Sequence, residues 1–285
     1  MKLLCFFQGE RRHLGLKLPE GILDLTAAGY PGDLTAAMAG WPASQAAIAQ
    51  LAAGGGPLLD EASLRWAPPA PPHAKILCVG LNYKRHIEET TRDGPAVYPP
   101  EPLLFAKFSN ALSAHQDTVR LPASASRYDY EAELVIVIGK SGMDISPARA
   151  PEHIFGYTCG NDLSARDAQK KSSQWLIGKS LPGFAPVGPW IVPREDIDPC
   201  NLRIQCYRGG QLAQDANTND MLFDVYTIVS YASRYIRLEP GDLIFTGTPS
   251  GVILGLPYEK RAWLRPGEEV AVVIEGIGRL TTKFS

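Results

Sequence analysis

Two glutamates stand two residues apart in a strand-like stretch of the sequence. The stretch is "YDYEAELVIVIGK", residues 128–140, and it contains Glu131 and Glu133. In a β-strand, residues two apart point to the same face, so these carboxylates lie side by side. Like charges repel each other and burial increases the cost, so we expect a positive charge or a cation between them.

A third carboxylate occurs in "GNDLSARD", residues 160–167, where Asp162 follows another strand-like run. One interpretation is a helix cap, with Ser164 and Asp167 as a capping box. Together with the two glutamates, Asp162 instead makes a site of oxygen ligands alone. Such a site favours Mg²⁺ or Mn²⁺, with Ca²⁺ as a non-native occupant, and does not favour zinc.

A histidine and a glutamate are spaced for one helix face in "GLNYKRHIEE", residues 80–89. His86 and Glu89 are three apart, which places both on the same side of a helix. Pairs of this kind are common on ordinary surface helices. Beside a metal site, the pair can act as a general base on a nearby water.

The elements that carry these residues are mainly strands. Even-numbered positions from Ala132 to Ile138 are apolar, and Val135 and Val137 continue the glutamate face, so this strand runs from a polar mouth into a core. Further strands are expected at "KILCVGLNY", "PLLFAKFSNAL", "IFGYTCGNDLS", "VGPWIV", "LRIQCYR", "DLIFTGTP" and "EEVAVVIEGIGRLTTKF".

Helices are few in this reading. A helix is expected over 163–176, and the clearest helical spacing lies in 220–238. Strands and helices do not alternate regularly, which argues against a doubly wound sheet. The expected class is a mixed, β-rich α+β fold.

The chain divides at a proline-rich segment. Residues 1–65 are expected to form a small N-terminal α/β domain, with an alanine-rich helical stretch that Pro42 interrupts. Residues 66–73, within "WAPPAPPHAK", form a stiff linker, and residues 74–285 form the catalytic domain.

Composition narrows the function classes. A net charge of −2 gives no indication of nucleic acid or of an anionic membrane, and no apolar run has transmembrane length. Five scattered cysteines without a CxxC pair argue against a disulfide framework, so we expect a cytoplasmic location. No dinucleotide fingerprint, HExxH or GxSxG motif is present.

Six segments in order resemble the fumarylacetoacetate hydrolase (FAH) superfamily. They are "GLNYKRHIEE", "YDYEAELVIVIGK", "GYTCGNDLSARDAQ", "GKSLPGFAPVGPW", "NTNDMLFDV" and "LEPGDLIFTGTPSGV", and the resemblance covers about residues 74–285. It implies a FAH-type β-sandwich or roll in the catalytic domain. It also implies a homodimer and a small-molecule 2-oxo acid substrate.

The resemblance assigns a role to each matching residue. Glu131, Glu133 and Asp162 become the metal ligands, His86 with Glu89 the water-activating dyad, and Lys179 the lysine that neutralises charge on the substrate. The substrate-binding positions that it implies are Arg166, Gln174, Thr248 and Lys107.

Two departures from the common pattern concern the substrate. "LPGF" follows Lys179 where many members have an aspartate-containing segment, and Ile253 and Leu254 occur where a glycine is usual. The C-terminal segment resembles a branch with oxaloacetate decarboxylases and 2-hydroxyhepta-2,4-diene-1,7-dioate isomerase-like proteins.

The leading functional prediction is cleavage of a C–C bond, by hydrolysis or decarboxylation, in a 2-oxo or 1,3-dicarbonyl acid such as an acylpyruvate or oxaloacetate. The reaction would pass through a metal-stabilised enolate. The alternative is an isomerase or hydratase of unsaturated 2-oxo dioic or deoxy-sugar acids with the same metal site. A non-catalytic protein is the third hypothesis, and the full set of acid, base and ligand positions argues against it.

Overall fold

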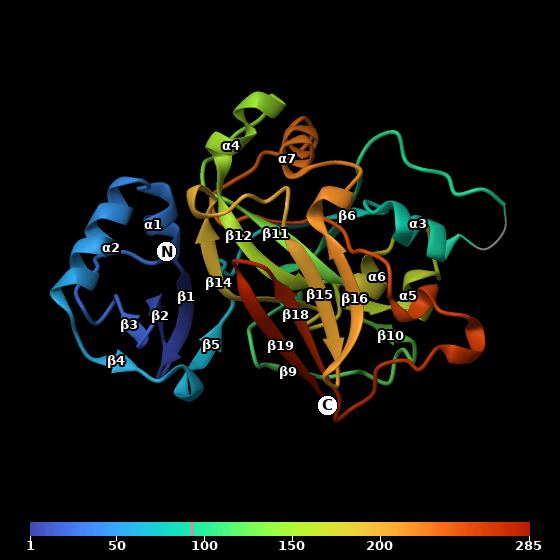
Figure 1. Ribbon diagram of the computed structural model, residues 1–285, viewed down its shortest axis with the longest axis horizontal. Coiled ribbons are helices and arrows are strands. Elements are labelled where there is room, and N and C mark those ends of the chain that lie inside the picture. Colours follow the sequence, from blue (N-terminus) through green and yellow to red (C-terminus); the bar gives the residue numbers. More distant parts are fainter. Residues whose placement is uncertain (92–93) are drawn as a thin grey trace.

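The larger of two main sheets runs through the whole molecule. The computed structural model describes residues 1–91 and 94–285 and is shown in Figure 1. Along this twelve-stranded sheet the strands are β4 (Leu58–Leu59), β3 (Gly21–Asp24), β2 (Arg11–Leu18), β1 (Leu3–Gln8), β14 (Ala185–Pro193), β12 (Ile154–Asn161), β11 (Ala132–Ile138), β17 (Leu243–Phe245), β6 (Ile76–Gly80) and β7 (Leu103–Lys107). Two further strands pair at its side, β5 (Arg65–Ala67) with β1 and β8 (Leu112–Ser113) with β14.

A second sheet packs against the centre of the first. Its five strands are, in order, β16 (Gln211–Asn217), β15 (Arg203–Arg208), β18 (Glu269–Ile274), β19 (Gly278–Phe284) and β9 (Thr118–Val119). A short ladder joins β10 (Tyr128–Asp129) to β13 (Ser164–Ala165). The β-rich α+β class predicted from the sequence is therefore confirmed, with two packed sheets in the catalytic part.

Strand β11 faces two different parts of the core, as its alternating pattern predicts. Leu134 and Ile136 pack in the cluster that includes Ile204 and Val272 of the five-stranded sheet. Val135 and Val137, on the glutamate face, belong to a separate cluster with residues of β1, β6 and β17. All seven residues of β11 are buried, so the strand is held on both faces.

The N-terminal unit contributes its own helices and joins the larger sheet. Helices α1 (Leu34–Ala39) and α2 (Ala43–Gly54) lie on either side of Trp41 and Pro42, and they cover one side of the small β1–β4 sheet in Figure 1. Strand β1 pairs with β14 at Leu3 and Ile191. Residues 68–75 contain no helix or strand, and the domain boundaries at 65 and 74 stay predictions.

The remaining helices are short, and one expected helix is absent. They are α3 (Lys84–Thr90), α4 (Ala150–His153), α5 (Arg166–Gln169), α6 (Leu176–Lys179) and α7 (Val225–Ser233). Short 3₁₀ turns are Glu61–Ser63, Ser109–Ala111, Pro147–Arg149, Arg194–Asp196, Thr218–Asp220, Ile253–Gly255 and Tyr258–Lys260.

The prediction of one helix over 163–176 is wrong. Between α5 and α6 the polar run of 170–174 has no apolar face to bury, so tertiary packing does not support a continuous helix there. Helix α7 does form within 220–238, where the Asp224 side chain caps it by accepting from the Thr227 amide at 2.7 Å.

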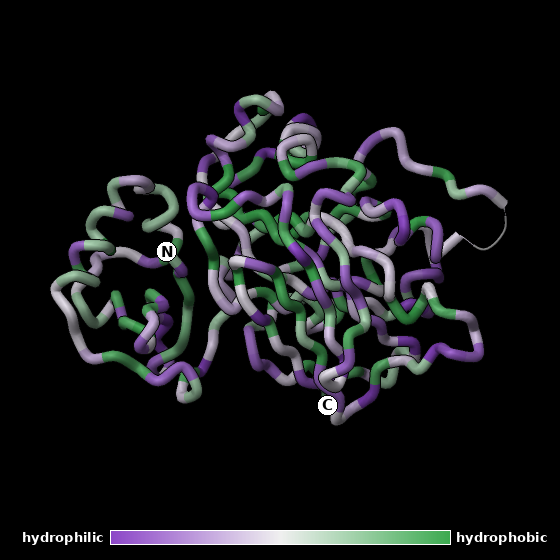
Figure 2. The backbone as a smooth tube through the Cα atoms, in the orientation of Figure 1, coloured by the Kyte–Doolittle hydropathy of each residue, from purple (hydrophilic) through white to green (hydrophobic). Residues whose placement is uncertain are grey.

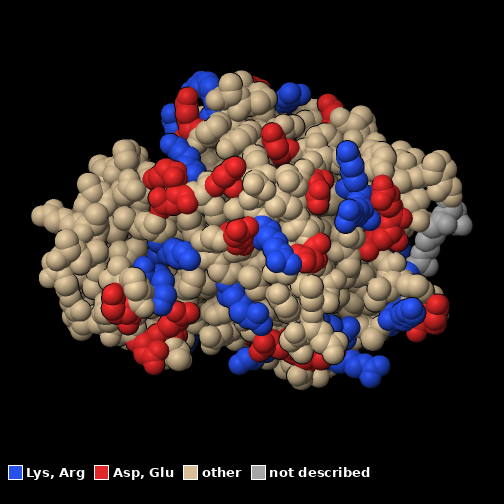
Figure 3. All heavy atoms as spheres, viewed as in Figure 1, with Lys and Arg blue, Asp and Glu red and all other residues tan. Residues whose placement is uncertain are grey.

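Hydrophobic stretches follow the central strands of the larger unit, while many peripheral turns are hydrophilic (Figure 2). On the face shown in Figure 3, acidic and basic side chains are intermixed and neither sign forms a continuous patch. Among the described residues, no helix has the length and apolar character needed to cross a membrane.

Candidate active site

Three carboxylates meet where β11 begins and β12 ends. The antiparallel pairing of Ala132 with Asn161 brings Asp162 beside Glu131, and the Asp162 amide donates to the Glu131 carbonyl at 2.9 Å. Ligand atoms of Glu131, Glu133 and Asp162 lie within 4.8 Å of one another. All three side chains are buried, so this cluster is part of the core and not a solvated acidic surface.

The three carboxylates differ in their partners. Burial, followed by repulsion from Asp162 and Glu131, raises the pKa of Glu133 well above its usual range. Its Oε2 accepts the Gly247 amide at 2.7 Å, and among the described residues no cation contacts it within ion-pair distance. Burial also acts to raise the pKa of Glu131, but Arg166 and Lys179 outweigh it and lower that pKa.

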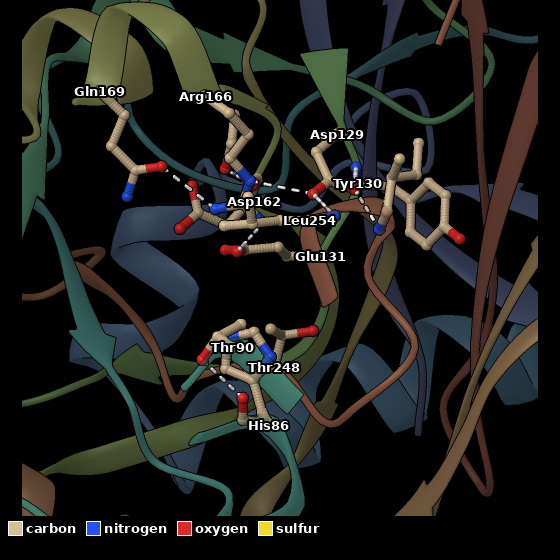
Figure 4. A network of polar contacts seen from close by, with 12 residues as sticks. His86, Thr90, Asp129, Tyr130, Glu131, Asp162, Arg166, Gln169, Thr248 and Leu254 are labelled. Atoms are coloured by element: carbon tan, nitrogen blue, oxygen red, sulfur yellow. Dashed lines mark hydrogen bonds and ion pairs between the residues drawn. The ribbon is translucent and has the colours of Figure 1, made fainter. Parts of the chain in front are cut away.

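Two buried cations reach the cluster from the segment after Asp162. Lys179 Nζ donates to Glu131 Oε2 at 2.7 Å and to Asp162 Oδ2 at 2.6 Å. Arg166 Nη2 donates to Glu131 Oε1 at 2.6 Å, as Figure 4 shows. Burial opposes the charge on Lys179, but Asp162 and Glu131 raise its pKa to about 12, so this lysine stays charged.

A third buried cation, Lys107 at the end of β7, is enclosed behind the site. Its Nζ lies 2.6 Å from Asp162 Oδ1 and donates to the carbonyls of Leu163, Lys179 and Phe184 at 3.0, 2.5 and 2.6 Å. The side chain has no exposed area and does not line the cavity. Lys107 therefore holds the surrounding backbone together, whereas the sequence suggested a substrate contact.

The predicted dyad lies on α3, directly after the turn that leaves β6. Leu81 adopts a positive φ of 56° in this turn. The Asn82 side chain fixes the turn by donating to the carbonyls of Phe223 and Thr246 at 3.0 and 2.7 Å. On the helix, His86 Nδ1 and Glu89 Oε1 are 2.9 Å apart.

One loop, residues 247–255, contacts each part of the site through its backbone. The Gly247 amide donates to Glu133, and the Gly251 amide donates to Glu89 Oε2 at 2.9 Å. Gly247 has a φ of +97°, and a Cβ there would lie 2.8 Å from Asn82 Cβ, so only glycine fits this approach. We refer to this segment as the 247–255 loop.

The three carboxylates, Arg166, Lys179 and His86 line one cavity of about 350 Å³. Its walls are formed by Val79, Gly80, Leu81, His86, Thr90, Phe105, Glu131, Glu133, Asp162, Arg166, Gln169, Lys170, Ser172, Trp175, Lys179, Thr248 and Leu254. Figure 4 shows Arg166 and Glu131 on one side of this site, with His86 and Thr248 on the other. One wall is aromatic, since Trp175 packs edge-on against Phe105 with ring centres 5.2 Å apart.

The remaining predicted contacts divide between the cavity and the surface. Thr248 lines the cavity, where its Oγ1 accepts from Gln214 at 2.9 Å. Gln174 is exposed and does not line it. Gln169, which was not predicted from the sequence, does line the cavity and accepts from Arg166 at 3.1 Å. Its spacing of three residues from Arg166 was the available signal.

Comparison with known proteins identifies the family. Residues 75–285 match the family described as Fumarylacetoacetate (FAA) hydrolase C-terminal. The chain belongs to the fumarylacetoacetate hydrolase family. It is therefore related to enzymes, and the resemblance noted in the sequence is confirmed.

Individual fumarylacetoacetate hydrolase relatives carry different activities in their names. A mitochondrial oxaloacetate tautomerase of Bos taurus is 35% identical over 278 residues, which cover 95% of this chain and 87% of the relative. The fumarylacetoacetate hydrolase of Exiguobacterium antarcticum has a TM-score of 0.81 and 34% identity, with 100% of this chain and 99% of the other covered.

A third relative contains ligands. The maleylpyruvate hydrolase of Sphingobium sp. SYK-6, in complex with manganese(II) and pyruvate, has a TM-score of 0.81 and 28% identity, covering 100% of this chain and 98% of the other.

The carboxylate cluster of this family member fits a divalent cation. Its donors are oxygens only, which hard cations such as Mg²⁺ and Mn²⁺ prefer. Burial raises the pKa of Glu133, and repulsion from Asp162 and Glu131 raises it further. A cation held by Glu131, Glu133 and Asp162 would relieve this repulsion.

Proposed function

We propose that this protein is a divalent-metal-dependent enzyme that interconverts the keto and enol forms of a small 2-oxo dicarboxylic acid, with oxaloacetate as the substrate. The observation that carries the proposal is the meeting of three buried carboxylates with His86 and Lys179 in one cavity. The oxaloacetate tautomerase of Bos taurus, similar over nearly the whole chain, supports this choice of reaction.

In the proposed site, Glu131, Glu133 and Asp162 would hold Mg²⁺ or Mn²⁺. When bound, the cation supplies a Lewis acid that polarises the oxo group and its neighbouring carboxylate. The charged Lys179 side chain contributes positive charge at the same wall of the cavity, where the negative charge of an enolate develops.

His86 is the proposed base. In the keto-to-enol direction it removes a proton from C3, and the C2 oxygen takes up a proton from solvent; the reverse direction returns a proton to C3. Glu89 accepts at Nδ1, so this side of the ring carries the proton and Nε2 is the basic nitrogen. Thr90 and Thr248 complete the polar wall near His86.

Cleavage of a C–C bond in an acylpyruvate is the second candidate. It is favoured by the dyad geometry and by the similarity to maleylpyruvate hydrolase. Here His86 would deprotonate a water that attacks the distal carbonyl, the C–C bond would break, and the pyruvate enolate would leave and take up a proton. Both candidates share the enolate, so product analysis separates them.

The test is a substrate panel with purified protein and Mg²⁺ or Mn²⁺. We expect faster loss of the enol absorbance of oxaloacetate, no change in the mass of the compound, loss of activity with EDTA and recovery with Mn²⁺. Fragments from acetylpyruvate or fumarylpyruvate would favour the second candidate. Full activity after exhaustive EDTA treatment would contradict the proposed metal site.

Residue roles, the homodimer and the cytoplasmic location belong to the same proposal. Sedimentation of the purified chain tests the dimer. His86→Ala tests the dyad, because both candidate reactions use His86 as the base. Unchanged turnover of oxaloacetate and of acylpyruvates in this variant would contradict that role.

A further inference from the structure

Asp129 is a buried carboxylate that lies behind the cavity and does not line it. It has no exposed area and ends the short strand β10, two residues before Glu131. Its Oδ2 accepts from Arg166 Nε at 2.9 Å and from the Leu254 amide at 3.0 Å. Its Oδ1 accepts from the Ile253 amide at 2.9 Å and from the Tyr130 amide at 3.0 Å.

Through Arg166, Asp129 reaches the carboxylate cluster. The guanidinium contacts Asp129 through Nε and Glu131 through Nη2, so the two carboxylates fix its plane from two edges (Figure 4). Without Asp129, the Arg166 Nε would be a buried donor with no partner from this strand. The orientation of the group that holds Glu131 therefore depends on Asp129.

Through the 247–255 loop, Asp129 reaches the dyad. The two amides that it binds directly precede Gly255, and a Cβ on Gly255 would lie 2.5 Å from Glu89 Cδ. The same loop donates the Gly251 amide to Glu89. The backbone that Asp129 fixes is thus in contact with the carboxylate that orients His86.

We propose that Asp129 is a positioning residue that holds the carboxylate cluster and the His86–Glu89 dyad at a fixed separation across the cavity. The inference rests on the proposed function for its activity readout only. A carboxylate is required because each oxygen serves a different set of donors, and an amide has one acceptor oxygen. Asn at this position must therefore lose either the Ile253 and Tyr130 amides or the pair formed by Arg166 and Leu254.

A matched control exists in Asp242, directly before β17. It is 3% exposed, accepts the amides of Lys75 and Glu239 at 2.9 and 2.8 Å, and pairs with Lys75 Nζ at 2.7 Å. Like Asp129, Asp242 thus combines backbone amides with one cation, two amides here and three at Asp129. It does not line the cavity, and its partners do not contact the cavity carboxylates or the dyad.

The experiment compares Asp129→Asn with Asp242→Asn in the full chain. We measure kcat, the Kd for Mn²⁺ by calorimetry, hydrogen exchange of peptide 250–257, and Tm. For Asp129→Asn we expect kcat to fall by about 100-fold, since small displacements of reacting groups have effects of this size. We expect the Kd for Mn²⁺ to rise by about 10-fold and exchange in 250–257 to accelerate. Asp242→Asn should lower Tm by a similar amount and leave kcat, the Kd for Mn²⁺ and hydrogen exchange of 250–257 unchanged.

The outcomes separate this inference from the proposed function. If the wild type turns over no 2-oxo acid, the proposed function fails, while Mn²⁺ affinity and hydrogen exchange still test Asp129. The inference would be overturned if Asp129→Asn left hydrogen exchange in 250–257 and the Kd for Mn²⁺ unchanged. It would also be overturned if Asp242→Asn changed these quantities and kcat as much as Asp129→Asn does.

If Asp129→Asn does not fold, two other variants test its two connections. One changes Arg166, which connects Asp129 to the carboxylate cluster, and the other changes Gly255, which connects the 247–255 loop to Glu89. Arg166→Lys must raise the Kd for Mn²⁺ without accelerating exchange in 250–257. Gly255→Ala must lower kcat without changing that Kd. Failure of either result overturns the positioning role.

Discussion

The two sides of the cavity are built in different ways. On the carboxylate side, Glu131 and Asp162 adjoin the ends of buried strands of the large sheet and are held by the charges of Lys179, Arg166 and Lys107. On the dyad side, His86 and Glu89 belong to a helix of seven residues, and Glu89 is held by the Gly251 amide.

This difference predicts how each side responds to substitution. Removing one partner from a buried charge cluster leaves other charges uncompensated, so the fold itself is affected. A hydrogen bond from a loop amide contributes little to global stability, so the dyad side can lose its geometry while the protein remains folded. Stability and activity should therefore separate between the two sides.

The largest effect is expected from the two glutamates. Glu131→Gln and Glu133→Gln should each reduce metal-dependent turnover by about 1000-fold or more, because the Lewis acid contributes several kcal/mol to the barrier. Without metal, Glu131→Gln should lower the free energy of unfolding by roughly 3–5 kcal/mol, since Arg166 and Lys179 lose a charged partner.

The metal-free stability of Glu133→Gln should instead equal or exceed that of the wild type. The raised pKa of Glu133 means that the folded state disfavours its charge, and glutamine removes that charge. Denaturant unfolding in EDTA checks both variants. Equal destabilisation by the two substitutions would contradict the difference between these carboxylates.

On the dyad side, His86→Ala should slow proton transfer by about 10²–10⁴-fold. The Kd for Mn²⁺ should stay unchanged, because His86 is not among the three clustered carboxylates. Steady-state kinetics and calorimetry measure the two quantities. His153→Ala serves as the control, since His153 is also buried but contacts the Lys140 carbonyl away from the cavity. Loss of Mn²⁺ binding in His86→Ala would show that the two sides are not separable.

A smaller effect is expected from Gly255→Ala. The new methyl group would displace the Glu89 carboxylate and lower kcat by about 10-fold, with little change in Tm. Gly54→Ala is the matched control, because a Cβ at Gly54 meets no atom within 4 Å. A kcat equal to that of the wild type would show that Glu89 can move without consequence.

The smallest effect on activity is expected at His115, which lies on neither side of the cavity. Its effect on stability should still be measurable. Burial lowers the pKa of His115 from 6.5 to about 4, and its Nδ1 accepts the Thr281 amide. The folded state thus prefers neutral His115. The stability that depends on it is complete above pH 6.5 and is lost as pH falls toward 4, by up to roughly 3 kcal/mol.

His115→Asn keeps an acceptor and should remove this part of the acid loss, while kcat at pH 7.5 stays unchanged. Unfolding curves from pH 7.5 to 4 measure the difference between variant and wild type. An identical pH dependence in both proteins would contradict the assignment to His115.

Local spacing in the sequence predicted many residues of the site. The alternation in 131–138 placed Glu131 and Glu133 on one face, and the structure confirms that the two faces of β11 enter different core clusters. The same alternation extends back to Asp129, which shares the parity of Glu131 and Glu133. Gln169 carried a similar local signal, its spacing of three residues from Arg166, although the sequence predicted Gln174 instead.

Other features depended on contacts between distant segments. Lys107 lies 55 residues before Asp162 in sequence but 2.6 Å from it in space, so its enclosure cannot be derived from local pattern. Within the expected helix over 163–176 the only complete helix is the short α5, because the polar run of 170–174 has no apolar face to bury. Tertiary packing outweighed helix propensity there.

The sequence by itself determined the family, the β-rich class and the carboxylates that share a strand face, because these depend on ordered motifs and a two-residue period. Only the tertiary structure decided which cations neutralise each carboxylate, which glutamine enters the cavity and how Asp129 links both sides. Those outcomes depend on which loops and strands meet in the fold. Burial then determines which charges keep a partner.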